Sequence, residues 1–270
     1  ELALAIGPDG VAQIAYVDGA ANELVFGTRQ GEAWSLAPIT TAGHNLALAV
    51  GQDNRPQLIL IRDNRLVYWT RQGDTWQSEA ISPEGAMVFN AFLALDGQDQ
   101  AHVVYTADGV VTEAARQGAN NWTAEPLPVE NVVGMALGPG GTLHLLTLTF
   151  RTEGVKPPFI IFTLWLSERV AGQWTEQAIY EDMYTGEEQV LNAGRLWVDA
   201  GGTLHLVTSH WYGWLADHYS QSAASIFLLP WTPIAPLSSS WRPWPRRRTR
   251  SIPMPATARR PCGATTWPST

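Results

Sequence analysis

The sequence predicts an all-β fold, a β-propeller of four-stranded blades, and three observations predict it. One pattern recurs along the chain, with Trp34, Trp76, Trp122 and Trp174 at intervals of 42, 46 and 52 residues. Each recurrence contains short apolar or alternating runs separated by turn residues, and no stretch has the period of an amphipathic helix. Four strands in a unit of about 40–50 residues are typical of blades repeated around an axis.

Each repeat divides into four predicted strands. In the second repeat the first strand is residues 46–50, and the Asp53-Asn54 turn that follows suits a tight hairpin. The second strand alternates apolar and polar residues, the third is residues 66–70, and a glycine-containing turn leads to the landmark tryptophan and the fourth strand. We expect four complete blades and a partial fifth, truncated from a ring of six to eight. Their approximate bounds are 1–44, 45–90, 91–131, 132–193 and 194–225.

The last segment, residues 226–270, loses this pattern and differs in charge. All 25 acidic residues lie at or before Asp217, whereas residues 218–270 hold seven arginines and no acid. We interpret 226–270 as an irregular tail rich in Pro, Arg and Ser, as an out-of-frame translation of a GC-rich gene would give. A basic, Pro-rich linker or membrane-surface tail is the alternative. Because the chain opens on a strand-like LALAI without Met, we also expect that its true start is missing.

The composition excludes several function classes. Cys262 is the only cysteine, so the chain can form no internal disulfide and no Cys-based metal site. No run of 18 apolar residues is present, so we expect no membrane span. The acidic body, with a net charge of -8 for the whole chain, argues against nucleic acid as a partner. We expect no cofactor and no metal, and the oligomeric state stays open.

Residues that recur at one position of each repeat have two interpretations. One position early in the second strand carries glutamine or histidine, namely Gln13, Gln57, His102, His144 and His205. Three histidines could suggest a metal site, but a ring spaces equivalent residues too widely to share one ion. We therefore expect a structural hydrogen bond repeated from blade to blade. Likewise, we expect the landmark tryptophans to pack between neighbouring sheets and not to stack on a ligand.

The turn between the third and fourth strands resembles the bacterial-neuraminidase repeat, or Asp-box, of sialidase-like propellers. That motif runs Ser-x-Asp-x-Gly-x-Thr-Trp, and its second half is matched by Gly31 with Trp34 and by Gly73 with Trp76. The defining aspartate is absent, and an arginine takes its place in both repeats. The resemblance implies a propeller that faces glycans in an extracellular or cell-envelope location. Fucose-binding lectin propellers are a second resemblance, by rhythm alone.

Catalysis in the sialidase family requires three arginines that clamp the substrate carboxylate, a Tyr–Glu nucleophile pair and an acid/base Asp. We recognise none of these in the matching context, and catalytic residues are therefore not assigned.

We expect the ligand site where the repeats differ, on the second-to-third loops and the blade-to-blade connections. Three long excursions fall on adjacent blades and on one face, at residues 151–158, 180–194 and 210–218. Aromatic side chains there could stack on a sugar, and charged ones could bind hydroxyls. The candidate ligand-binding residues are Trp211, Tyr212, Trp214, Tyr184, Glu181, Asp182, Arg151 and His210. The alternative is a solvated acidic loop over a local aromatic cluster.

Three functions therefore remain open. The first is a non-catalytic, sialidase-like or lectin-like propeller module that binds carbohydrate or another polar ligand on the loop face of blades four and five. The second is an exo-acting glycoside hydrolase whose catalytic residues lie partly outside this sequence. The third is a protein-interaction scaffold, a common role of propellers.

Overall fold

The protein is all-β. The computed structural model describes residues 1–153, 159–184, 188–192, 196–199, 201–213 and 220–229, and beyond residue 181 it describes side chains only within 196–207. These residues form five antiparallel sheets and contain no α-helix. The described residues all belong to one compact unit. The predicted tail at 226–270 lies outside the described residues after position 229.

Four of the sheets are simple meanders in which each strand pairs with the next along the chain. The first sheet comprises β1 (Leu2–Ile6), β2 (Ala12–Asp18), β3 (Glu23–Gln30) and β4 (Ala33–Thr41). The second comprises β5 (His44–Val50), β6 (Pro56–Arg62), β7 (Arg65–Gln72) and β8 (Thr75–Ala80). The third comprises β9 (Val88–Leu95), β10 (Ala101–Ala107), β11 (Val110–Gly118) and β12 (Asn121–Pro126). The fourth comprises β13 (Val132–Leu137), β14 (Leu143–Glu153), β15 (Phe159–Val170) and β16 (Gln173–Tyr184), with a 3-10 turn, η1 (Pro139–Gly141), after β13.

The fifth sheet has an interrupted first strand. Both β17 (Glu188–Asn192) and β18 (Leu196–Val198) pair antiparallel with β19 (Leu204–Gly213). Their registers continue one another along the same edge of β19, and β20 (Ser220–Leu229) pairs along the other edge. The fifth sheet therefore contains the first three strand positions of a blade, which agrees with the predicted partial blade.

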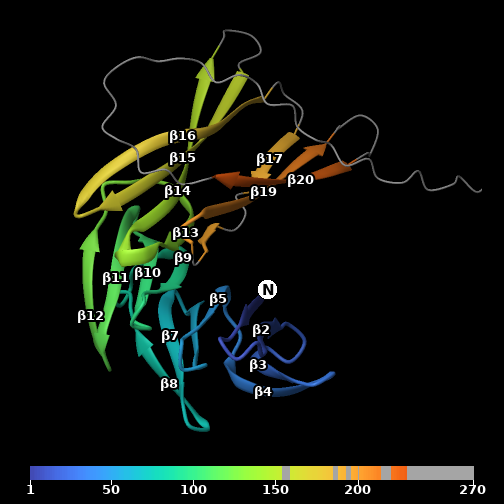
Figure 1. The fold of residues 1–270 in the computed structure, drawn as a ribbon. Helices are drawn as coiled ribbons and strands as arrows, with labels where there is room; N and C mark the ends of the chain where they lie inside the picture. The colour runs from blue at the N-terminus through green and yellow to red at the C-terminus, as the bar shows by residue number, and fades with distance from the viewer. Residues whose placement is uncertain (154–158, 185–187, 193–195, 200, 214–219, 230–270) are drawn as a thin grey trace, which may run out of the picture. The chain divides into compact units, whose positions relative to one another are not determined.

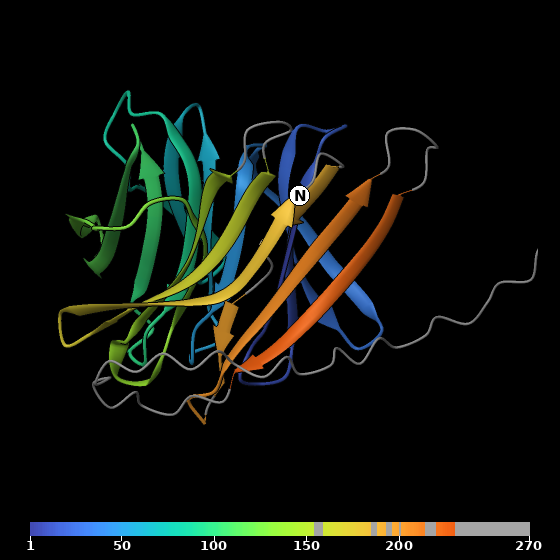
Figure 2. The ribbon, with the colours of Figure 1, turned by 90° about the horizontal axis from the view of Figure 1, so that it is seen from above.

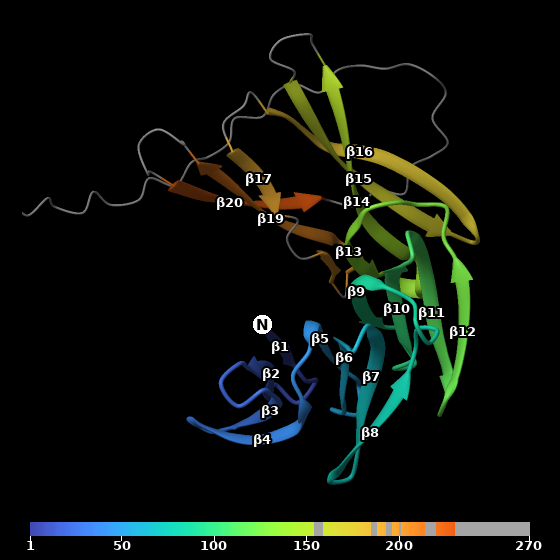
Figure 3. The ribbon, with the colours of Figure 1, turned by 180° about the vertical axis from the view of Figure 1, so that it is seen from behind.

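The first strands of consecutive sheets lie side by side, and this makes the fold a propeller. Strand β1 contacts β5, β5 contacts β9, β9 contacts β13, and β13 contacts β18. In Figures 1 and 3 these strands lie on the inner side, and β4, β8, β12 and β16 lie outside them. Figure 2 shows the same sheets after a turn of 90°. The contacts join the sheets in sequence order, and a closed ring is not observed among the described residues.

The core lies between the sheets and contains the landmark tryptophans. The ring of Trp76 meets Phe26 of the first sheet edge-on, with centroids 5.0 Å apart, and Trp122 meets Tyr68 of the second sheet at 5.2 Å. Trp174 packs in the same way on the buried cluster between the third and fourth sheets. The predicted packing role is confirmed for these three. Trp34 belongs to the first sheet, which no other described sheet precedes, and it is 40% exposed.

The repeated glutamine and histidine position is structural, as predicted, but it acts in two ways. Gln13 and Gln57 each donate a side-chain hydrogen bond to a backbone carbonyl in the next sheet, at 3.1 and 3.0 Å. The histidines instead contact carboxylates of their own sheet; His102 lies 2.9 Å from Glu113 and His205 lies 2.8 Å from Asp199. This position therefore joins two sheets at Gln13 and Gln57, and it joins two side chains of one sheet at His102 and His205.

Candidate functional site

The fourth and fifth sheets contain the longest strands of the fold, and the predicted site falls on them. Strands β15 and β16 have 12 residues each and β14 has 11, whereas the strands of the first three sheets have five to nine. Pairing between β14 and β15 continues from Leu143↔Arg169 to Glu153↔Phe159. The extra length is added at the end where β14 leads into β15, which is the end that the sequence predicts to carry the site.

Parts of the predicted excursions are therefore strand and not loop. Residues 151–153 belong to β14, residues 180–184 to β16, residues 188–192 to β17 and residues 210–213 to β19. Strands β14 and β15 are rich in Thr, Phe and Ile, which favour a pleated strand, so their ladder continues past the point where the shorter repeats turn. In the second and third sheets the same connection is a two-residue turn with positive φ, at Asp63-Asn64 and Asp108-Gly109.

Arg151 and Glu181 come together on these extended strands. Arg151 Nη1 donates a hydrogen bond to Glu181 Oε2 at 2.9 Å, and Arg151 Nε donates to Glu153 Oε1 at 3.1 Å. The Thr163 hydroxyl donates to the same Glu181 oxygen at 3.2 Å. Register explains the meeting, because Glu181 lies directly opposite Thr163 across β15 and β16. Two predicted site residues, 30 positions apart, thus form one hydrogen-bonded group.

The electrostatics of this group follow from that geometry. The hydrogen bond and charge of Arg151 hold the pKa of the Glu181 carboxyl below its ordinary value. The hydrogen bonds to Glu181 and Glu153 in turn raise the pKa of Arg151. Both side chains remain about half exposed, at 47% for Arg151 and 52% for Glu181. The pair is therefore ionised and open to solvent at neutral pH.

The remaining predicted site residues are not tested by side-chain geometry. Asp182 and Tyr184 lie in β16, and His210, Trp211 and Tyr212 lie in β19, but their side chains lie outside the described residues. Trp214 lies outside them altogether. In register, Asp182 is opposite Phe162 and Trp211 is opposite Val190.

Sequence reasoning missed an aromatic pair on the same extension. Phe150 is 56% exposed and meets Phe162 edge-on with centroids 5.1 Å apart. Because neighbouring residues of a strand point to opposite faces, Phe150 lies on the other face of the sheet from Arg151. The alternation of apolar and polar residues in the segment TLTFRTE is the signal that could have placed it on a strand.

The described residues offer no metal site or membrane-spanning helix. No group of three or more His, Cys, Asp or Glu among them is arranged to hold a metal ion. No helix among them reaches the length and apolar character needed to cross a bilayer.

Comparison with known proteins assigns no family. No family model matches the chain, and no curated protein matches it. A fucose lectin from Kordia zhangzhouensis is 14% identical with a TM-score of 0.36, over 48% of this chain and 100% of the lectin. An α-L-arabinofuranosidase from Lactobacillus brevis is 10% identical with a TM-score of 0.46, over 86% of this chain and 90% of the enzyme. An intramolecular trans-sialidase from Ruminococcus gnavus is 13% identical with a TM-score of 0.38, over 70% of this chain and 45% of the enzyme.

Proposed function

We propose that this chain is a non-catalytic propeller module, sialidase-like or lectin-like, that binds carbohydrate or another polar ligand at the extended ends of the fourth and fifth sheets. The observation that carries the proposal is the Arg151–Glu181 pair. It stands on two strands that run beyond those of the first three sheets, and it is held in place by Thr163 and Glu153.

The pair suits a ligand with hydroxyl groups. A guanidinium group only donates hydrogen bonds and an ionised carboxylate only accepts them, so the two side by side can satisfy both functions of a vicinal diol. Their mutual hydrogen bond of 2.9 Å fixes both side chains before a ligand arrives, which lowers the entropy lost on binding. The aromatic residues predicted on β16 and β19 would supply the apolar face on which a sugar ring stacks.

The same pair disfavours one catalytic role for Glu181, that of the general acid of a glycosidase. A glycosidase needs a carboxylic acid that is protonated near neutral pH, and such a group has a raised pKa. Arg151 acts in the opposite direction and holds the pKa of Glu181 low, so Glu181 is a poor general acid. The second carboxylate of a glycosidase works ionised, so the low pKa of Glu181 disfavours only the acid role.

A glycan array followed by calorimetry with the strongest array ligand tests the proposal. We expect Arg151→Ala and Glu181→Gln each to weaken binding about tenfold, because each removes charge-assisted hydrogen bonds. Arg65→Ala is the matched control, since Arg65 begins β7 at the short hairpin that corresponds to the extension. The proposal fails if no glycan binds, or if binding survives both changes at the extension.

A further inference from the structure

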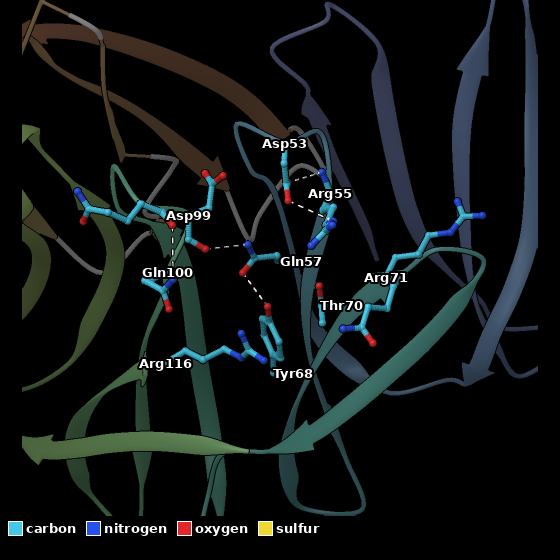
Figure 4. A pocket seen from close by; sticks show the side chains of 11 residues that line it. Asp53, Arg55, Gln57, Tyr68, Thr70, Arg71, Asp99, Gln100 and Arg116 are labelled. Carbon is cyan, nitrogen blue, oxygen red and sulfur yellow. Dashed lines mark hydrogen bonds and ion pairs between the residues drawn. The ribbon is translucent and has the colours of Figure 1, made fainter. Parts of the chain in front are cut away.

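A polar pocket of about 270 Å³ lies between the second and third sheets, away from the site proposed above. It is lined by the turn before β6, the turn before β10 and the ends of β7 and β11 (Figure 4). These are first-to-second and third-to-fourth turns, so the pocket lies at the opposite end of the strands from the Arg151–Glu181 pair. None of the predicted site residues lines it.

The turns that form the pocket are fixed by the repeat itself. Asn54 and Asp99 occupy equivalent positions and both have positive φ, at 62° and 61°. The Asp99 carboxylate accepts the backbone N–H of Gln52 at 2.8 Å, and Gln57 Nε2 donates to the Asp99 carbonyl at 3.0 Å. Both bonds cross from the second sheet to the third. The two walls of the pocket are therefore tied together at one edge.

Tyr68 and Arg116 form the floor of the pocket. The Tyr68 hydroxyl donates to Gln57 Oε1 at 2.7 Å, and the Arg116 guanidinium lies over the Tyr68 ring at 5.2 Å. Arg116 Nε and Nη2 are bound to Glu79, and no described residue bonds its Nη1. Figure 4 shows Arg116 beside Tyr68 and shows the Arg71 side chain directed away from the other lining residues.

The arginines of the pocket lining are each paired with a carboxylate of the protein, and the Asp99 carboxylate accepts the backbone N–H of Gln52. Arg55 Nε lies 3.2 Å from the Asp53 carboxylate, and Arg116 is bound to Glu79. Each arginine that faces the pocket thus has its own carboxylate, so an anion would gain little net attraction there. Hydrogen-bond donors and acceptors are nevertheless both plentiful in the pocket, because three glutamine side chains line it in addition to the charged residues. They are Gln57, Gln98 and Gln100.

We propose that this pocket is a second ligand site, which takes a single neutral sugar ring or a small polyol of similar size. The volume falls just below the roughly 300–1,000 Å³ of sites for drug-sized ligands, which leaves room for one ring and not for a chain of them. A neutral polyol matches the lining, because each hydroxyl donates and accepts and carries no charge to be compensated. The Nη1 edge of Arg116 and the glutamine amides are the groups that it meets.

Isothermal titration calorimetry with methyl glycosides of glucose, galactose and mannose, and with glucuronate as the anionic counterpart, tests this site. At least one neutral glycoside should bind saturably, and more tightly than glucuronate. Arg55→Ala and Gln98→Ala alter exposed side chains of the rim, and each should weaken binding about tenfold. Gln30→Ala is the matched control, since Gln30 is exposed at the same end of the first sheet.

The outcomes separate this site from the one proposed above. Binding that is weakened by Arg55→Ala and Gln98→Ala but not by Arg151→Ala supports the pocket, whatever happens at the extension. Binding that is lost in Arg151→Ala and kept in the rim variants places the sugar at the extension and overturns the pocket. Absence of saturable binding by all three glycosides, or preference for glucuronate, also overturns it.

Discussion

Arg116 of β11 donates two hydrogen bonds to Glu79 of β8, from Nη2 to Oε1 at 2.6 Å and from Nε to Oε2 at 3.2 Å. Trp122 Nε1 donates to the same carboxylate at 2.8 Å. Burial would raise the pKa of Glu79, but the hydrogen bonds from Arg116 and Trp122 lower it overall. Arg116 lies directly opposite Trp122 in the ladder, so the arginine and the landmark tryptophan of one sheet together hold a carboxylate of the preceding sheet.

Loss of Arg116 should therefore destabilise the protein. Arg116→Ala leaves the Glu79 carboxylate, only 6% exposed, without its cation, and removal of one partner of such a pair costs about 3 kcal/mol. Urea unfolding measures the change. Arg29→Ala is the matched control: Arg29 holds the equivalent position in the first sheet but donates only to the Gly31 carbonyl in its own turn. We expect the control to cost less than about 0.5 kcal/mol, and equal costs would contradict the inter-sheet role.

The stability lost on replacing a landmark tryptophan should likewise depend on whether its ring packs on a preceding sheet. Trp76→Ala removes a ring packed on Phe26 and on the core between the first and second sheets, which should cost about 3–5 kcal/mol. Trp34 occupies the equivalent position of the first sheet, where the face that carries it is exposed, so Trp34→Ala should cost about 1 kcal/mol. Thermal or urea unfolding of both variants measures the two losses of stability. A similar loss in both would show that the ring contributes within its own sheet.

The repeat made most of this architecture predictable. Strand order, the packing of Trp76, Trp122 and Trp174, and the structural use of the glutamine and histidine position all follow from equivalence between copies. The strand extensions were not predicted, because the point at which a long alternating run such as β14 turns depends on its pairing with β15. Composition carries no information about that register.

The candidate sites were harder to predict from the sequence than the fold was. The meeting of Arg151 with Glu181 depends on which residues of β14, β15 and β16 lie opposite one another, although the sequence did place both on one face. The pocket escaped notice for a different reason. Its residues, such as Gln57 in β6 and Gln98 in the turn before β10, belong to parts of the chain that look like repeated scaffold, and the cavity forms where two copies with different side chains face each other.

Acid should weaken the contact between the third and fourth sheets. Glu113 of β11 lies 2.5 Å from Arg169 of β15 and 2.9 Å from His102. Burial raises the pKa of Glu113, but the hydrogen bond from His102 and the charge of Arg169 outweigh it and lower the pKa below the ordinary value. A carboxyl with a lowered pKa contributes stability above its unfolded pKa of about 4.3, and that stability is lost as the pH falls through the folded pKa.

The free energy of unfolding should therefore fall as the pH drops below about 4.3, and Glu113→Gln should reduce that dependence as well as the stability at pH 7. Urea unfolding at several pH values between 3 and 7 measures both effects. Glu32→Gln is the control, because Glu32 is exposed in the turn before β4. An unchanged acid dependence in Glu113→Gln would contradict the assignment.

The junction between the first and second sheets lacks the carboxylate that the next two junctions have. Glu79 and Glu125 each stand three residues after a landmark tryptophan and bind an arginine of the following sheet, Arg116 and Arg169 respectively. The equivalent residue of the first sheet is Ala37, and the arginine equivalent to Arg116 is Arg71, which lies opposite Trp76 as Arg116 lies opposite Trp122. Arg71 pairs only with the exposed Asp74 of its own turn, and its buried Nε has no hydrogen-bond partner among the described residues.

Ala37→Glu should therefore supply the missing partner and stabilise the protein by about 1 kcal/mol, since a hydrogen bond to a charged group then satisfies a buried donor. The same change in an Arg71→Ala background should bring no gain, because the introduced carboxylate would have no cation to bind. A double-mutant cycle from urea unfolding measures the difference as a coupling energy. A gain in stability that persists without Arg71 would contradict this pairing. The introduced carboxylate would then act through strand propensity or surface charge.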